Sequence, residues 1–168
     1  MDSLFNKWKT KIPKYSEVHV DLFNKLSKKG GAEGDKKISY GKIFSNNYEF
    51  YTYAFFLGLY EDEFCPIGDD EKRKDFSHAI EFWGNKSNRD REDFSSIQKD
   101  IFVALIAKSD IDFISLEKGE LEINEVVKLL ISNMESYTNG GLNLISDKLQ
   151  DNPSAFLNPT SFMDLIVT

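Results

Sequence analysis

The sequence predicts an all-α fold, a single domain of six to eight helices around a central aromatic helix over residues 48–60. Two observations predict it. Along most of the chain, apolar residues recur at the spacing of three and four residues that marks one face of a helix. In addition, residues 48–60 hold seven aromatic rings that would surround a helix axis, which is typical of a helix enclosed by others.

The N-terminal part is predicted to hold two helices. The first includes residues 4–8, whose apolar side chains lie at helical spacing, and it ends before Pro13. The second is expected over residues 17–28, with Ser16 as its N-cap. The glycine-rich, polar segment 30–37 that follows is predicted to be a mobile loop.

The aromatic helix comes next, and Asn46 with Glu49 resembles a capping box at its start. A buried strand is the alternative, because Tyr, Phe and Thr favour strands. The length of the segment favours the helix, because strands rarely exceed ten residues. The seven rings belong to Tyr48, Phe50, Tyr51, Tyr53, Phe55, Phe56 and Tyr60.

The second half of the chain continues the helical pattern after a loop over residues 61–72. Gly84 is expected to end one of its helices, and Gly140 with Gly141 to separate two others. Residues 113–123 form either one small β-hairpin that turns at Lys118 or a loop. The expected helices cover residues 76–83, 94–108, 124–137, 142–149 and 160–167.

Charge divides this domain into two parts. Residues 1–43 carry ten lysines and five acids, a net charge of +5, whereas residues 44–168 carry 11 basic and 23 acidic residues, a net charge of −12. Such an asymmetry indicates either a basic arm for nucleic acid or an acidic partner, or two parts of one domain that face each other. We favour two parts of one domain that face each other, because residues 1–43 contain no arginine, the residue best suited to phosphate and base recognition.

Metal and cofactor motifs are not found, and we expect neither a metal nor a cofactor. The two histidines, His19 and His78, lie on different predicted helices, and His78 with Glu81 gives one isolated pair on a helix face. The segment that starts at Asp110 fails as a calcium loop at its glycine position and at its final glutamate position. The glycines match neither a phosphate-binding loop nor a dinucleotide fingerprint.

No catalytic residue is predicted, and we lean against an enzyme. The single cysteine, Cys65, precedes a proline in a loop, where such a thiol is usually inert or partly buried. No nucleophile-elbow motif is present. A small hydrolase with an acid–base site near His78 and Glu81 remains the second alternative.

Binding is the favoured kind of function. The leading hypothesis is a non-catalytic interaction or accessory subunit, whose partner is another protein or a second copy of the chain. Its candidate anchors are Trp8, Tyr15 and Trp83. The alternative is a nucleic-acid-binding accessory protein, although an acidic chain with a pI near 4.9 is unusual for this class. Its candidate residues are Lys9, Lys11, Lys14, Lys28, Lys29, Lys36 and Lys37.

The N-terminus lacks the apolar core of a signal peptide, and no apolar run is long enough to span a membrane. We therefore expect a cytoplasmic protein that does not bind membranes.

Four runs of sequence resemble those of small, poorly characterised bacterial helical proteins that accompany DNA-modification or anti-phage defence gene clusters. They lie between Tyr51 and Pro153 and contain no catalytic signature. The resemblance implies an accessory subunit and assigns no functional residue. The runs are YTYAFFLGLY, HAIEFWGNK, IFVALIAKSDIDFISLEKGE and YTNGGLNLISDKLQDNP.

Overall fold

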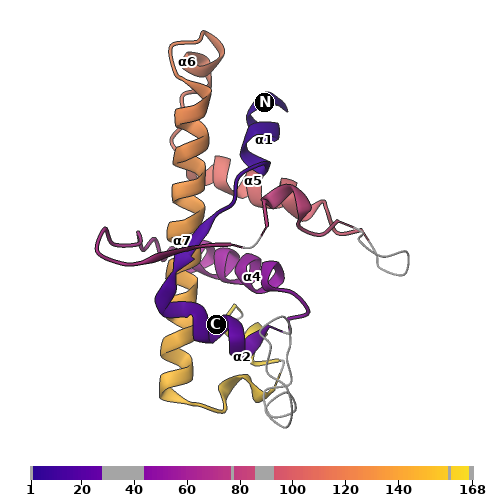
Figure 1. Cartoon of the computed structure of the whole chain (residues 1–168), viewed down its shortest axis with the longest axis vertical. Helices are drawn as coiled ribbons and strands as arrows, with labels where there is room; N and C mark the ends of the chain where they lie inside the picture. Colours follow the sequence, from indigo (N-terminus) through magenta and orange to yellow (C-terminus); the bar gives the residue numbers. More distant parts are fainter. Residues whose placement is uncertain (1, 28–43, 77, 86–92, 159, 167–168) are drawn as a thin grey trace. The chain divides into compact units, whose positions relative to one another are not determined.

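The all-α prediction is confirmed by the computed structural model, whose described residues form helices and one short pair of strands (Figure 1). The structure describes residues 2–27, 44–76, 78–85, 93–158 and 160–166. The predicted loop 30–37 lies outside the described residues. The α-helices are α1 (Asp2–Lys9), α2 (Val20–Leu26), α4 (Asn47–Tyr60), α5 (Ile97–Lys108), α6 (Phe113–Glu117), α7 (Ile123–Asp151) and α8 (Ser161–Asp164). The strands are β1 (Lys14–Ser16) and β2 (Arg73–Asp75), and the 3-10 turns are η1 (Glu17–His19), η2 (Ile80–Phe82) and η3 (Ala155–Leu157).

The chain divides into two compact units, and the single-domain prediction stays a prediction. Unit 1 comprises Met1–Lys14 and Asp75–Glu135, and unit 2 comprises Tyr15–Lys74 and Ser136–Thr168. Helix α7 supplies its first half to unit 1 and its second half to unit 2.

In unit 1, the predicted first helix forms and packs its aromatic face on α5. The Phe5 and Trp8 rings lie 5.2 and 5.4 Å from the ring of Phe102. Leu4 and Leu105 are also buried. Rings at these separations add a geometric preference to the apolar area that they bury.

The helix predicted over residues 76–83 is wrong, because two backbone donors of this segment bind carbonyls of the N-terminal part of unit 1. The Phe76 N–H donates to the Pro13 carbonyl, and the Ile80 N–H donates to the Lys11 carbonyl. Extended structure and the short turn η2 replace the helix. Gly84 ends the segment with a φ of +75°, a backbone conformation that glycine adopts without strain.

The small antiparallel strand pair lies at a different place from the predicted hairpin. The pair consists of β1 and β2, whereas the hairpin was expected within residues 113–123. The Glu17 N–H donates to the Lys72 carbonyl, which sets the register, and Lys14 and Asp75 form an ion pair at 3.6 Å. The hairpin at 113–123 is wrong, because α6 occupies the start of this segment.

In unit 2, the aromatic helix is confirmed as α4. Phe50, Tyr51, Ala54 and Phe55 have no exposed surface, so apolar residues on several sides of the helix are enclosed. The predicted second helix is shorter than expected, because it begins as the turn η1 and ends at Leu26.

The predicted break at Gly140 and Gly141 is wrong, and α7 is one helix of 29 residues. Both glycines are buried inside it. A Cβ atom at Gly141 would collide with the backbone carbonyl of Ala54 in α4, and one at Gly140 would collide with the carbonyl of Glu63. These glycines therefore allow close approach of neighbouring backbone and do not end the helix.

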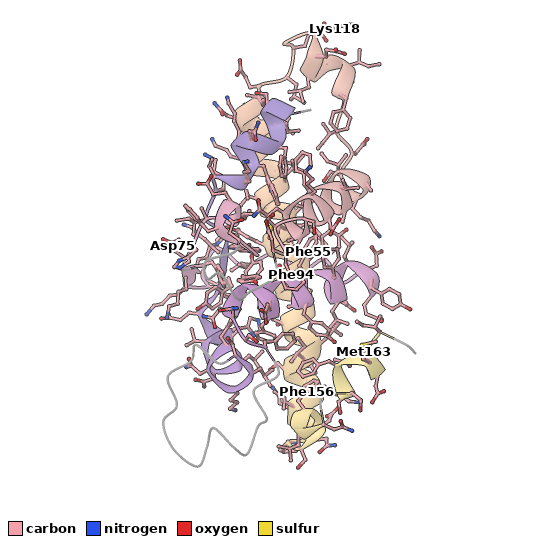
Figure 2. All side chains as sticks on the ribbon, turned by 90° about the vertical axis from the view of Figure 1, so that its right-hand side faces the viewer. Phe55, Asp75, Phe94, Lys118, Phe156 and Met163 are labelled. Carbon is pink, nitrogen blue, oxygen red and sulfur yellow. The ribbon has the colours of Figure 1, made fainter. Side chains whose placement is uncertain are left out.

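The C-terminal segment of unit 2 packs through Phe162 of α8, which is shorter than the predicted helix over residues 160–167. The Phe162 ring stacks on Phe156 at 4.3 Å, and the Tyr53 hydroxyl donates to the Phe162 carbonyl at 2.7 Å. Figure 2 labels Phe156, which lies in η3, and Met163, which lies in α8.

Within the described ranges, no helix is both long enough and apolar enough to cross a membrane.

Candidate functional site

The three predicted partner anchors are buried, which corrects their assignment. Trp8 is 0% exposed, Trp83 is 1% exposed and Tyr15 is 8% exposed. Trp83 also donates its indole N–H to the His78 carbonyl. A ring that already fills the core of its own chain cannot anchor a partner without unfolding that core, so these residues have a structural role.

The predicted lysine patch can be followed at three of its seven positions. Lys14 pairs with Asp75, and the Lys9 ammonium lies 5.4 Å above the centre of the Phe5 ring. Lys11 is exposed. The other four lie outside the described residues, and the nucleic-acid hypothesis stays a prediction; they are Lys28, Lys29, Lys36 and Lys37.

The predicted pairing of His78 with Glu81 on a helix face is wrong, because no helix forms there. His78 is exposed in an irregular segment, and Glu81 lies in the turn η2. Among the described residues, no group of three or more His, Cys, Asp or Glu side chains is placed to hold a metal ion.

A buried polar cluster surrounds His19 in unit 2. His19 is 4% exposed, and its Nε2 lies 3.1 Å from Oδ1 of Asn139. The Asn139 Nδ2 donates to the Cys65 carbonyl at 3.1 Å, so Oδ1 faces His19 as an acceptor and His19 Nε2 carries the proton. Burial lowers the pKa of the imidazole, and this effect outweighs the hydrogen bond that His19 donates to Asn139 and the nearby charge of Glu71, which favour the protonated form.

Glu71 extends this cluster into the loop between α4 and β2. Its carboxylate accepts from the Ser16 hydroxyl at 2.6 Å and from the Gly68 N–H at 3.1 Å. The hydrogen bond from Ser16, followed by that from Gly68, lowers the pKa of Glu71. Arg73 donates to the Ile67 carbonyl and holds the same loop. With its polar groups bound to one another, the cluster joins loop, strand and α7, and we assign it a structural role.

An open groove lies in unit 1, where α1, α6 and the start of α7 meet. Its volume is about 510 Å³. Leu4 is fully buried at its base, whereas Phe113, Leu116 and Leu121 are half-buried along it. We call this site the acidic groove; its lining is Ser3, Leu4, Phe113, Leu116, Glu117, Gly119, Leu121, Glu122 and Ile123.

Local hydrogen bonds fix the wall of the acidic groove that α6 provides. Asp112 caps α6 by accepting from the N–H groups of Ile114 and Ser115, both at 3.0 Å, and from the Ser115 hydroxyl at 2.7 Å. Gly119 then turns the chain with a φ of +74°, and the next two N–H groups, those of Glu120 and Leu121, donate back to the Ser115 carbonyl. Figure 2 shows Lys118 beside this short turn.

The segment that forms much of the acidic groove is negatively charged, and two of its acids, Glu117 and Glu122, line the groove. Residues 110–125 contain six acids and one lysine, and all seven of these charged side chains are exposed. On α1, Lys7 reaches across to Asn124, with its Nζ 3.4 Å from the amide oxygen. Ile114 of α6 is 67% exposed. The acids are Asp110, Asp112, Glu117, Glu120, Glu122 and Glu125.

A smaller open groove, of about 330 Å³, lies in unit 2 between the ends of α4 and α7 and the segment that includes Asp164. It combines leucines with acids, as the acidic groove does, and it also includes Lys148. Its lining is Leu57, Glu61, Leu144, Asp147, Lys148, Asp151, Asp164 and Leu165.

Sequence reasoning missed the acidic groove. The alternation of apolar and acidic residues in FISLEKGELEI was the available signal, but the same alternation favours a hairpin. The cap at Asp112 instead starts a helix, and the turn after it brings Leu116 and Leu121 to one side.

No family model matches the chain, and no curated protein or solved structure matches it either.

Proposed function

We propose that the chain is a non-catalytic interaction subunit, an accessory component of a larger bacterial protein assembly. The observation that carries the proposal is the acidic groove of unit 1, an open site whose lining combines apolar and acidic side chains; Ile114, in the helix α6 that forms its wall, is also exposed. Exposed apolar surface with a polar rim is typical of protein interaction sites. The resemblance to proteins of DNA-modification and anti-phage gene clusters points to an assembly of that kind.

The placement of the acid–base candidates supports binding over catalysis. In the part of the chain that the structure describes, His19 is enclosed and its proton is committed to Asn139. His78 is exposed and does not share a helix face with Glu81. A catalytic site needs a base within hydrogen-bond reach of its reactant in an accessible cavity, and neither histidine has that setting.

The proposal is tested by purifying the tagged full-length chain from its native host at its natural level of expression. We expect it to elute with a partner at a fixed stoichiometry, measured by light scattering after size exclusion. The variant His78→Ala/Glu81→Ala should retain that complex and the cellular phenotype of the wild type. A chain that elutes as a monomer without a stoichiometric partner would contradict the proposal.

A further inference from the structure

We infer that the acidic groove binds a short amphipathic helix of a partner protein, whose apolar side chains are flanked by lysines or arginines. This inference rests on the proposed function and adds the chemistry of the partner. Three features favour this partner: the lining of the groove, the charge around it and the backbone hydrogen bonds at its wall.

The lining of the acidic groove offers apolar surface to an occupant. A volume of about 510 Å³ lies within the range of sites that hold small ligands or several side chains. Phe113, Leu116 and Leu121 remain half-buried in the chain alone, so an occupant would remove further apolar area from water.

The negative charge around the groove favours an occupant with positive charge. Six exposed acids and one lysine over residues 110–125 leave a strong excess of negative charge beside the groove. Lys7 of α1 donates to Asn124, and with Lys118 it brings two positive charges against six negative ones, which leaves an excess of four negative charges. An acidic peptide would be repelled, whereas a basic one would be attracted over several ångströms and held at the rim.

Backbone geometry favours a helix over an extended peptide. A peptide that binds as an added strand needs free N–H and C=O groups along an edge. At the α6 wall, the N–H groups of Lys118, Gly119 and Glu120 already donate to carbonyls of α6. Recognition at this wall therefore depends on side chains, as it does when a helix lies in a groove.

The test uses two synthetic helical peptides of about 18 residues, a length at which an isolated helix can form. Both carry leucines at positions i, i+3, i+4 and i+7, with lysines elsewhere in one and glutamates elsewhere in the other. Each is titrated into the labelled full-length chain and followed by fluorescence anisotropy and by amide NMR shifts. We expect the lysine peptide to bind with shifts concentrated at the acidic groove, and the glutamate peptide not to bind.

Two charge variants make the comparison specific. Glu117→Lys/Glu122→Lys reverses the rim of the acidic groove and should weaken binding at least tenfold. Asp147→Lys/Asp151→Lys changes the net charge by the same amount at the smaller groove of unit 2 and should leave the affinity within about twofold, since neither residue lines the acidic groove. A milder variant, Glu117→Gln/Glu122→Gln, should give an intermediate loss without placing a cation at the start of α7.

Several results would overturn the inference. These are absent binding of the lysine peptide, equal weakening by the two charge-reversal variants, shifts at the smaller groove, or a dimer of the chain that Glu117→Lys/Glu122→Lys disrupts. If the native complex forms but survives Glu117→Lys/Glu122→Lys, the proposed function stands and only the groove assignment fails. If the lysine peptide binds the groove and no native complex exists, the proposed function fails instead.

Discussion

Nε2 of His19 lies 3.1 Å from Oδ1 of Asn139, and this buried contact joins residues 120 positions apart in the sequence. Nδ2 of Asn139 donates to the Cys65 carbonyl, so the side-chain amide of one residue holds both a histidine and a loop in place. The contact requires a proton on Nε2, which both forms of the imidazole can supply, and burial of His19 favours the neutral form.

We predict that the chain becomes less stable as the pH decreases through the range in which a histidine takes up a proton. Its pKa is lowered by burial in the folded chain, whereas the unfolded chain has an ordinary value of about 6.5. The unfolded chain therefore takes up the proton first, and the free energy of unfolding should decrease from about pH 7 to about pH 5. Urea unfolding at a series of pH values measures this slope.

The variant His19→Gln retains a side-chain N–H but cannot titrate, so we expect a flatter slope between about pH 7 and pH 5. Glu71, the charged side chain near His19, has a lowered pKa, so its contribution is present above the ordinary Glu pKa and is lost at more acidic pH. An unchanged slope in His19→Gln would contradict the prediction.

Gly141→Ala should destabilise the chain. Alanine is a better helix former than glycine by about 1 kcal/mol, but its Cβ would meet the Ala54 backbone, and overpacking of this kind costs about 1–3 kcal/mol or more. The second effect wins because a backbone carbonyl inside a helix cannot move aside. Thermal and urea unfolding measure the loss, and Gln150→Ala, at an exposed position of the same helix, should be close to neutral.

These glycines show where sequence reasoning succeeds and fails. Helix α4 was predicted because a dense set of rings needs no knowledge of its neighbours to indicate burial. In the sequence alone, Gly140 and Gly141 indicate a helix break. In the structure, glycine is needed there because the backbones of Glu63 and Ala54, which are distant in the sequence, approach the helix closely. The helix predicted over residues 76–83 is wrong for a similar reason, since Lys11 and Pro13 accept two of the backbone hydrogen bonds of this segment.

The candidate site was harder to predict than the fold. Aromatic residues were chosen as anchors because such rings are frequent at interfaces, but Trp8 and Trp83 are just as suited to a core. The acidic groove arises when a turn at Gly119 places leucines of α6 and of the following segment beside α1. No local pattern encodes that juxtaposition.

Trp83→Ala should cost about 3–5 kcal/mol, the usual range for removal of a buried aromatic ring. The indole is 1% exposed, and its N–H donates to the His78 carbonyl. Phe94→Ala is the matched control, because Phe94 is 57% exposed and its loss should change stability by less than about 0.5 kcal/mol. Figure 2 labels Phe94. Equal costs for the two variants, measured by urea unfolding, would show that Trp83 is not a core residue.

The carboxyl group of Asp112 should titrate below the ordinary range for aspartate. Hydrogen bonds from the backbone and the hydroxyl of Ser115, and then from the Ile114 backbone, lower its pKa. The midpoint can be followed by NMR of the labelled carboxyl carbon, and Ser115→Ala should move it back toward the ordinary value. In Asp112→Ala, the amides of α6 should exchange faster with solvent, because the cap that orders this short helix is lost.

Tyr53→Phe should weaken the attachment of α8 to α4. The Tyr53 hydroxyl donates to the Phe162 carbonyl at 2.7 Å, and the loss of such a bond costs about 0.5–1.5 kcal/mol. The ring contact with Phe162 at 5.2 Å remains, so the change should be confined to the hydrogen bond. Hydrogen exchange should report faster opening of α8, and Tyr60→Phe is the control because Tyr60 is 60% exposed. Unchanged exchange in α8 would mean that ring packing alone holds this helix in place.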